Sequence, residues 1–147
     1  MRADPQQQAV YAWETMWPRW NISDIRLLDC RTYIRWACRQ YGVKDYPAVK
    51  QHDGRAFSWS CGNVISLNAN YHKNVAISLH EASHYITDRI FGAVEHHGQE
   101  FLGIYMALLT DAQVAPGLAL AATAEAHKLK WLPYRSISSK TLKRRKG

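Results

Sequence analysis

The sequence predicts a single α+β domain, and three observations support this prediction. The 147 residues match the length of one average domain. Apolar residues make up 47% and charged residues 21%, which is typical of a globular protein with its own core. Apolar residues recur at helical spacing at both ends of the chain, whereas Gly, Pro, Asn and Asp interrupt the middle. We therefore expect helices around a small, mainly antiparallel sheet in one domain over residues 1–134, followed by a tail over 135–147.

Two helices are expected before the sheet. The first covers residues 5–17, and its apolar face consists of Val10, Trp13 and Trp17. The second begins at Ser23, a good N-cap residue, and ends near Gly42, a common helix stop. We expect the Trp residues of both helices to pack in the core.

Three short strands are expected between residues 43 and 70. They cover residues 47–50, 56–60 and 64–67. Two clusters of turn-forming residues separate them, His52-Asp53-Gly54 and Cys61-Gly62-Asn63. Such turns join neighbouring antiparallel strands, which is why the sheet is expected to be mainly antiparallel.

Three further helices are expected after the sheet. One covers residues 74–91 and stops at Gly92, and the next covers 99–111. An Ala-rich helix follows Pro116-Gly117 and extends to about Lys130, before Pro133 ends the pattern.

The positive charge of the chain is concentrated at its C-terminus. The net charge is +7, from 19 basic and 12 acidic residues. Residues 128–147 contain eight of the basic residues and no acidic one, which leaves 11 basic against 12 acidic residues in the rest. A basic tail can bind nucleic acid by releasing counterions, or it can simply be solvated. The tail residues that we expect to contact DNA are Lys140, Lys143, Arg144, Arg145 and Lys146.

The sequence also predicts a cytoplasmic protein without a membrane partner. Its apolar runs are shorter than the roughly 18 residues that a membrane-spanning helix needs. The first eight residues lack the apolar core of a signal peptide. The three cysteines, an odd number without a C-x-x-C pair, are expected to be ordinary thiols in a reducing compartment.

The helix expected over residues 74–91 contains an H-E-x-x-H motif, from His80 to His84. Four residues correspond to slightly more than one helical turn, so the two imidazoles project from nearly the same face. Two histidines placed in this way can bind one zinc ion. Glu81 lies about 100° around the helix from His80 and can act on water at the metal without being a ligand.

A catalytic zinc site usually has three protein ligands. Candidates for the third follow the Gly92 break, where the chain can return toward the H-E-x-x-H helix: Glu95, His96, His97 and Glu100. Adjacent histidines in an extended segment point in opposite directions, so we expect one of the pair to face the metal. Spacing alone leaves open which one it is.

These motifs together resemble the SprT-like (Spartan-type) zinc metallopeptidases. Their zincin core has an H-E-x-x-H helix followed by a third histidine in an H-G-x-x-F or H-G-P-E-F context. In this chain the second motif reads His97-Gly98-Gln99-Glu100-Phe101. The resemblance covers about residues 57–111 and implies that His97 is the third ligand. It also implies a zincin-like fold in which the strand at Val64–Asn68 lies at the sheet edge beside the cleft.

Two features differ from the commonest form of the family. Gln99 replaces the proline, and no cysteine follows Cys61, so the downstream Cys-rich zinc module is missing. The resemblance implies a minimal zinc peptidase that hydrolyses peptide bonds by a metal-activated water, with Glu81 as general base. Proteins associated with DNA are one implied substrate class. Tyr85, Arg89, His96 and Tyr105 have the chemistry to stabilise the oxyanion, but the sequence does not position them.

A different class of function also fits the sequence. The chain can be a nucleic-acid-binding module in which the metal is structural. Four protein ligands would then close the site, with His96 or Glu100 as the fourth. Substitution of Glu81 by Gln distinguishes the two, because only the peptidase needs this carboxylate.

Overall fold

The computed structural model describes residues 3–16, 23–70 and 73–133. This part of the chain forms an α+β fold with five helices and a three-stranded mixed sheet. The elements in chain order are α1 (Gln7–Glu14), α2 (Leu27–Gln40), β1 (Ala48–His52), β2 (Trp59–Cys61), β3 (Val64–Asn68), α3 (Val75–Phe91), α4 (Gln99–Asp111) and α5 (Gly117–Ala126). The α+β class is therefore confirmed. The expected tail over residues 135–147 lies outside the described residues.

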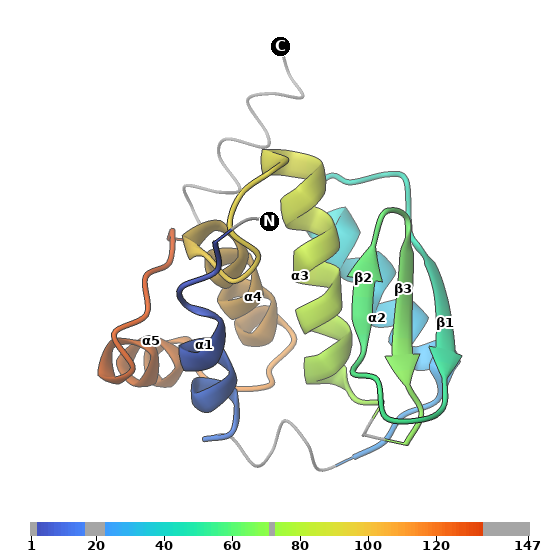
Figure 1. The fold of residues 1–147 in the computed structure, drawn as a ribbon, viewed down its shortest axis with the longest axis horizontal. Coiled ribbons are helices and arrows are strands. Elements are labelled where there is room, and N and C mark those ends of the chain that lie inside the picture. The colour runs from blue at the N-terminus through green and yellow to red at the C-terminus, as the bar shows by residue number, and fades with distance from the viewer. Residues whose placement is uncertain (1–2, 17–22, 71–72, 134–147) are drawn as a thin grey trace.

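Helix α3 lies at the centre of the molecule (Figure 1). It packs against α2 and the sheet on one side and against α4 on the other. Helices α1 and α5 lie on the α4 side, far from the sheet in this view (Figure 1). This central position explains why nearly every residue of α3 from Ala76 to Thr87 is buried. The H-E-x-x-H motif therefore lies inside the fold, between two groups of elements.

The expectation of a mainly antiparallel sheet is wrong. The strand order is β1-β3-β2, in which β3 pairs in parallel with β1 and antiparallel with β2. Each turn does reverse the chain, so consecutive strands run in opposite directions. However, β3 inserts between β1 and β2, and two strands separated by two reversals run parallel.

The strand order also corrects the expected position of Val64–Asn68. This segment is β3, the middle strand, and β2 forms the edge next to it. The β2–β3 hairpin closes through a two-residue turn at Gly62, whose φ of 59° suits glycine. Two polar side chains of this middle strand are buried and hydrogen-bonded. The Ser66 hydroxyl hydrogen-bonds Nδ1 of His52 at 2.6 Å, and the Asn68 amide donates to the carbonyl oxygens of Gly54 and Ala56.

Local sequence signals explain the bounds of α3. Asn74 is the N-cap, and its side chain accepts a hydrogen bond from the Ile77 amide at 2.8 Å. Gly92 ends the helix with a φ of 72°, which few other residues adopt. Apolar residues spaced three or four positions apart anchor the helix in the core: Leu79, Ala82 and Ile86 are fully buried, and Val75 and Ile90 pack against the core.

Three helices differ from their expected bounds. Helix α1 ends at Glu14, whereas its end was expected at residue 17. Residue 17 lies outside the described residues. Helix α2 begins at Leu27, because the Ile25 amide donates to the Lys73 carbonyl oxygen and the chain before it is extended. Helix α5 ends at Ala126, where Lys128 takes a φ of 58° and the Leu129 amide returns to the Ala124 carbonyl oxygen.

The tryptophans expected in the core are partly accounted for. Trp13 is fully buried and Trp36 packs against the core, while Trp17 lies outside the described residues. Among the helices that the structure describes, none has the length and apolar character needed to cross a membrane.

Candidate metal centre

Helix α3 places His80 and His84 one turn apart, with their rings in an edge contact at 5.0 Å between centroids. The two Nε2 atoms are 3.2 Å apart. Two ligands of a tetrahedral zinc ion, each bonded at about 2.05 Å, have their nitrogens about 3.3 Å apart. The spacing of the two histidines therefore already matches that of a pair of zinc ligands.

His97 reaches the same place from the connection between α3 and α4. Gly92 ends α3, the chain folds back, and Gly98 begins α4 as its N-cap. One ligand atom from each of the three histidines lies within 4.8 Å of the others. The His97 ring is 4.7 Å from the His84 ring and 5.5 Å from the His80 ring, centroid to centroid. The histidines expected to bind metal are thus brought together.

Carboxylates hold the outer nitrogens of two of these rings. The Nδ1 atom of His80 is 3.0 Å from Oε2 of Glu14, and Nδ1 of His97 is 2.8 Å from Oδ2 of Asp4. A carboxylate only accepts, so each ring donates its Nδ1 hydrogen. This tautomer leaves Nε2 as the atom that can bind a metal.

The buried Nε2 atom of His97 has no hydrogen-bond partner among the described residues. His97 is only 4% exposed, and an unsatisfied buried polar atom costs about 1–3 kcal/mol. A metal ion next to the His80 and His84 nitrogens would satisfy this atom. The residues therefore fit a divalent metal, and three imidazoles suit zinc.

The carboxylates also shift the pKa values of the rings. Burial acts to lower the pKa of His80, but the charge of Glu14 and its hydrogen bond outweigh burial and raise this pKa to about 9. Burial acts to raise the pKa of Glu14, yet His80 holds it below its ordinary value. Burial lowers the pKa of His97 despite the hydrogen bond to Asp4. Without metal, His80 and Glu14 therefore form an ion pair, and metal binding must release the Nε2 proton of His80.

Glu81 follows His80 on α3 and is 6% exposed. Burial raises the pKa of its carboxyl to about 7, although the neighbouring His80 opposes this shift. A carboxyl with a pKa near 7 can both take up and release a proton near neutral pH. Three imidazoles that converge, together with such a carboxyl next to His80 in the sequence, can bind a metal and transfer protons.

The other predicted candidates lie outside this group. His96 is exposed, with its ring centroid 5.9 Å from that of His84, and neither it nor Glu100 belongs to the three-histidine group. The candidate oxyanion donors Tyr85 and Arg89 both bond to Asp45. The Tyr105 hydroxyl is buried and donates to Glu14 at 2.6 Å.

Sequence reasoning missed the residues that α1 and its preceding turn contribute. Asp4 and Glu14 bond the histidines, and the Tyr11 ring lies 5.2 Å from the His97 ring. Phe101 stacks on His84 with centroids 4.3 Å apart. Glu14 did carry a signal, because this acidic residue stands four positions after Val10, on the apolar face of α1. Asp4 carried none, since its partner is more than ninety positions away.

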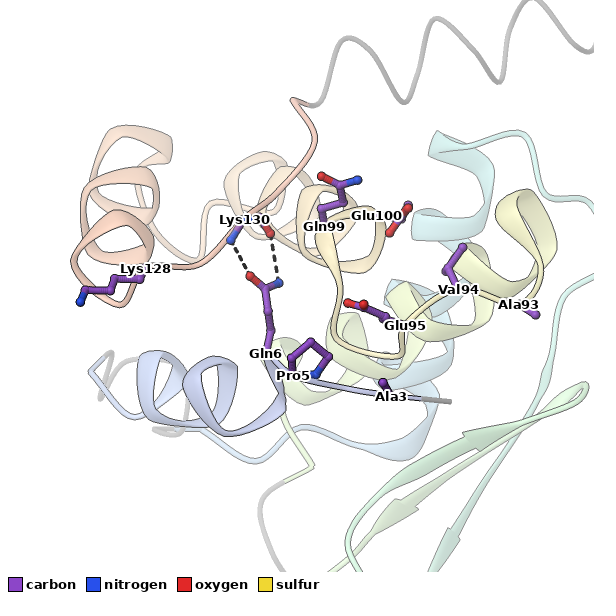
Figure 2. A pocket seen from close by; sticks show the side chains of 10 residues that line it. All are labelled: Ala3, Pro5, Gln6, Ala93, Val94, Glu95, Gln99, Glu100, Lys128 and Lys130. Atoms are coloured by element: carbon purple, nitrogen blue, oxygen red, sulfur yellow. Dashed lines mark hydrogen bonds between the residues drawn. The ribbon is translucent and has the colours of Figure 1, made fainter. Parts of the chain in front are cut away.

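A pocket of about 860 Å³ lies next to the connection between α3 and α4 (Figure 2). The turn before α1, this connection, the start of α4 and the chain after α5 line it. None of the three histidines lines it, and neither does Glu81. In Figure 2 the Gln6 side chain extends to Lys130 and bonds its backbone through both of its polar atoms. The pocket is therefore a neighbour of the metal centre and not part of it.

Comparison with known proteins returned no match to a protein-family model, to a curated protein or to a solved structure.

Proposed function

We propose that this chain is a zinc-dependent peptidase of the SprT-like kind. The observation that supports this proposal is the convergence of three histidine nitrogens beside a buried carboxyl with a pKa near 7. Nitrogen ligands from a helix and from the connection after it correspond to the two motifs of that family. Among the described residues no fourth His, Cys, Asp or Glu joins the three histidines, which favours a catalytic site with a free coordination position over a structural site closed by four ligands.

His80, His84 and His97 would hold the zinc ion through their Nε2 atoms. When bound, zinc supplies Lewis acidity, which polarises the scissile carbonyl and makes a water molecule more acidic. Glu14 and Asp4 keep the outer ring nitrogens of His80 and His97 occupied. They thereby hold both rings in the tautomer that the site requires.

Glu81 would act as the general base. Its carboxylate takes a proton from the attacking water and then donates that proton to the leaving amine. Burial raises the pKa of this carboxyl in the metal-free protein, which makes its carboxylate a better proton acceptor than an exposed one. Burial on α3 limits the motion of the side chain and excludes bulk water from it.

Substitution of Glu81 by Gln tests the proposal. We expect hydrolysis of an unstructured protein substrate to fall by at least ~100-fold, because the general base is lost. Zinc content and fold should stay those of the wild type. Glu125→Gln is the matched control, since Glu125 is an exposed carboxylate on α5. Wild-type protein that contains zinc but does not hydrolyse peptides, with or without DNA, would contradict the proposal and favour the structural-metal alternative.

Proteins bound to DNA are the substrate class that we propose. The support for this step is the basic C-terminal segment, which has no acidic residue over positions 128–147. Attraction of this segment to the phosphate backbone would raise the local concentration of DNA-associated proteins at the site.

A further inference from the structure

The turn before α1 holds His97 by both its backbone and its ring. Asp4 accepts hydrogen bonds from the His97 amide at 2.9 Å and from its Nδ1 atom at 2.8 Å. The Gln6 side chain donates to the His97 carbonyl oxygen at 3.0 Å. His97 lies on a connection and not on a helix, so these three bonds supply the rigidity that a regular element would otherwise give.

The other end of α1 holds the histidine of a different element. Oε2 of Glu14 accepts from Nδ1 of His80 at 3.0 Å and from the Tyr105 hydroxyl at 2.6 Å. Between the two ends, the Tyr11 ring packs against the rings of His80 and His97, at 6.4 and 5.2 Å between centroids. Residues 4–14 thus bridge two ligands that come from separate parts of the chain.

Contacts away from the histidines support residues 4–14 independently. The indole nitrogen of Trp13 donates to the Thr123 hydroxyl of α5 at 2.9 Å. Gln6 bonds both the amide and the carbonyl oxygen of Lys130, at 2.6 and 3.2 Å. The carboxylates therefore project from a segment that is anchored to α5 and to the chain after it.

We propose that residues 4–14, which we call the N-terminal clamp, set the metal affinity of the site. Asp4 and Glu14 are positioning residues that orient His97 and His80 and hold their Nε2 atoms toward the metal. The inference rests on the proposed metal site and adds a segment that neither sequence motif contains. Because coupling is reciprocal, zinc binding must in turn stabilise the docking of α1 on α3 and α4.

Zinc dissociation constants, measured by competition with a chromophoric chelator, test the clamp. We expect Glu14→Ala and Asp4→Ala each to weaken zinc binding by about 10- to 100-fold, which is typical of the loss of such outer partners. Glu14→Gln retains an accepting oxygen without the charge, so its affinity should be intermediate. Asp4→Asn retains one accepting oxygen, which can serve the His97 amide, but its NH2 group then faces the Nδ1 hydrogen of His97. This variant should therefore keep the backbone contact and still weaken zinc binding, which separates ring orientation from misfolding.

Two controls isolate the histidine contact. Tyr105→Phe removes the other hydrogen bond to Glu14 and leaves the bond to His80 in place, so zinc affinity should change by less than about threefold. Glu125→Gln removes an exposed carboxylate on α5 and should leave the affinity unchanged. A loss in Tyr105→Phe as large as that in Glu14→Ala would overturn the proposed role of Glu14.

Amide hydrogen exchange of α1 gives a second measurement, made on the 147-residue chain. Saturating zinc should slow exchange of the α1 amides in the wild type and have a smaller effect in Glu14→Ala. Wild-type protein that binds zinc, with unchanged affinity in the Asp4 and Glu14 variants and unchanged exchange in α1, would overturn the clamp and leave the metal site standing. Wild-type protein that binds no zinc would overturn both.

Discussion

At the scale of single residues, His97 shows how the fold prepares a metal site. Its two ring nitrogens have different surroundings, because Nδ1 faces Asp4 and the buried Nε2 faces the other two histidines. An ordinary core histidine would have both nitrogens satisfied by the protein. The ring is therefore placed for a ligand that the protein chain itself does not provide.

The pKa values at the site predict how pH affects the metal-free protein. The pKa of Glu81 rises from 4.5 to about 7 on folding, so the folded state binds a proton more tightly and stability falls between these pH values. The pKa of His80 rises from 6.5 to about 9, so its contribution is present below 6.5 and is lost as pH rises through 9. The pKa of His97 is lowered, so its contribution rises with pH up to 6.5, but this shift is smaller than those of Glu81 and His80. We therefore expect the free energy of unfolding of the metal-free protein to fall from about pH 5 to about pH 9.

Urea denaturation at several pH values, with a chelator present, measures this trend. Glu81→Gln should remove the decline in the lower half of the range and keep that in the upper half. The pKa of Glu14 is lowered, so this residue instead costs stability in acid, below its unfolded pKa of about 4.5. Stability that stays constant or rises between pH 5 and 9 would contradict the assigned surroundings of both groups.

Residues of the site differ in how far sequence alone can place them. His80, Glu81 and His84 are predictable because helical spacing fixes their relative positions over a few residues. The choice of His97 over His96 needs the family resemblance, since both histidines follow the same break. Asp4 cannot be predicted, because its contact to His97 depends on how the whole fold brings distant segments together.

At the scale of elements, α3 depends on its cap. The Asn74 side chain accepts from the Ile77 amide, and its backbone oxygen accepts from the Ser78 hydroxyl at 2.8 Å. Asn74→Ala should lower the free energy of unfolding by about 1 kcal/mol, because a buried amide at the start of the helix loses its partner. Thermal or urea unfolding of the metal-free protein measures this loss.

Asn74→Ser is the matched control for the cap. Serine is also a good N-cap residue, so this variant should retain most of the stability. Equal losses of stability in the two variants would show that the packing of the Asn74 amide group stabilises α3 and that its capping hydrogen bond contributes little.

The sheet shows which features of an element are local and which are not. Turn residues near Gly54 and Gly62 correctly indicate where the chain reverses, and the structure has three strands near the expected positions. Strand order depends on which edges meet in the folded protein, and no turn encodes it. The family resemblance implied an edge position for Val64–Asn68, whereas β3 lies in the middle of the sheet. The predicted start of α2 at Ser23 is wrong for a similar reason, because a contact between distant residues, Ile25 and Lys73, replaces the expected cap.

At the scale of the whole molecule, the net charge differs between the C-terminal segment and the rest of the chain. Residues 1–127 carry 11 basic and 12 acidic residues, so the positive charge belongs to the C-terminal segment. Removal of residues 135–147 should weaken binding to single-stranded DNA and flatten its dependence on salt, because fewer counterions are released. Fluorescence anisotropy with a labelled oligonucleotide at several salt concentrations measures both effects. Equal affinity and equal salt slope would show that the tail does not contact DNA.

The arrangement of the molecule also explains why the site combines distant segments. Helix α3 runs through the centre and carries the H-E-x-x-H motif, while α1 reaches it from the α4 side (Figure 1). Glu14 and Asp4, from the two ends of residues 4–14, bond His80 and His97, and His97 itself comes from the connection before α4. Sequence reasoning correctly places the motif on a helix, but the clamp becomes visible only in three dimensions.

The measurement that tests the central claim most directly is the zinc content of the purified protein by elemental mass spectrometry. We expect about one zinc ion per chain in the wild type, because three histidine nitrogens converge and one of them is buried without a partner among the described residues. His97→Ala should contain far less zinc, while His127→Ala, which changes a histidine outside the group, should contain as much as the wild type. A wild-type protein that holds no zinc even after zinc is supplied, or a His97→Ala variant that keeps its full complement, would contradict the three-histidine site.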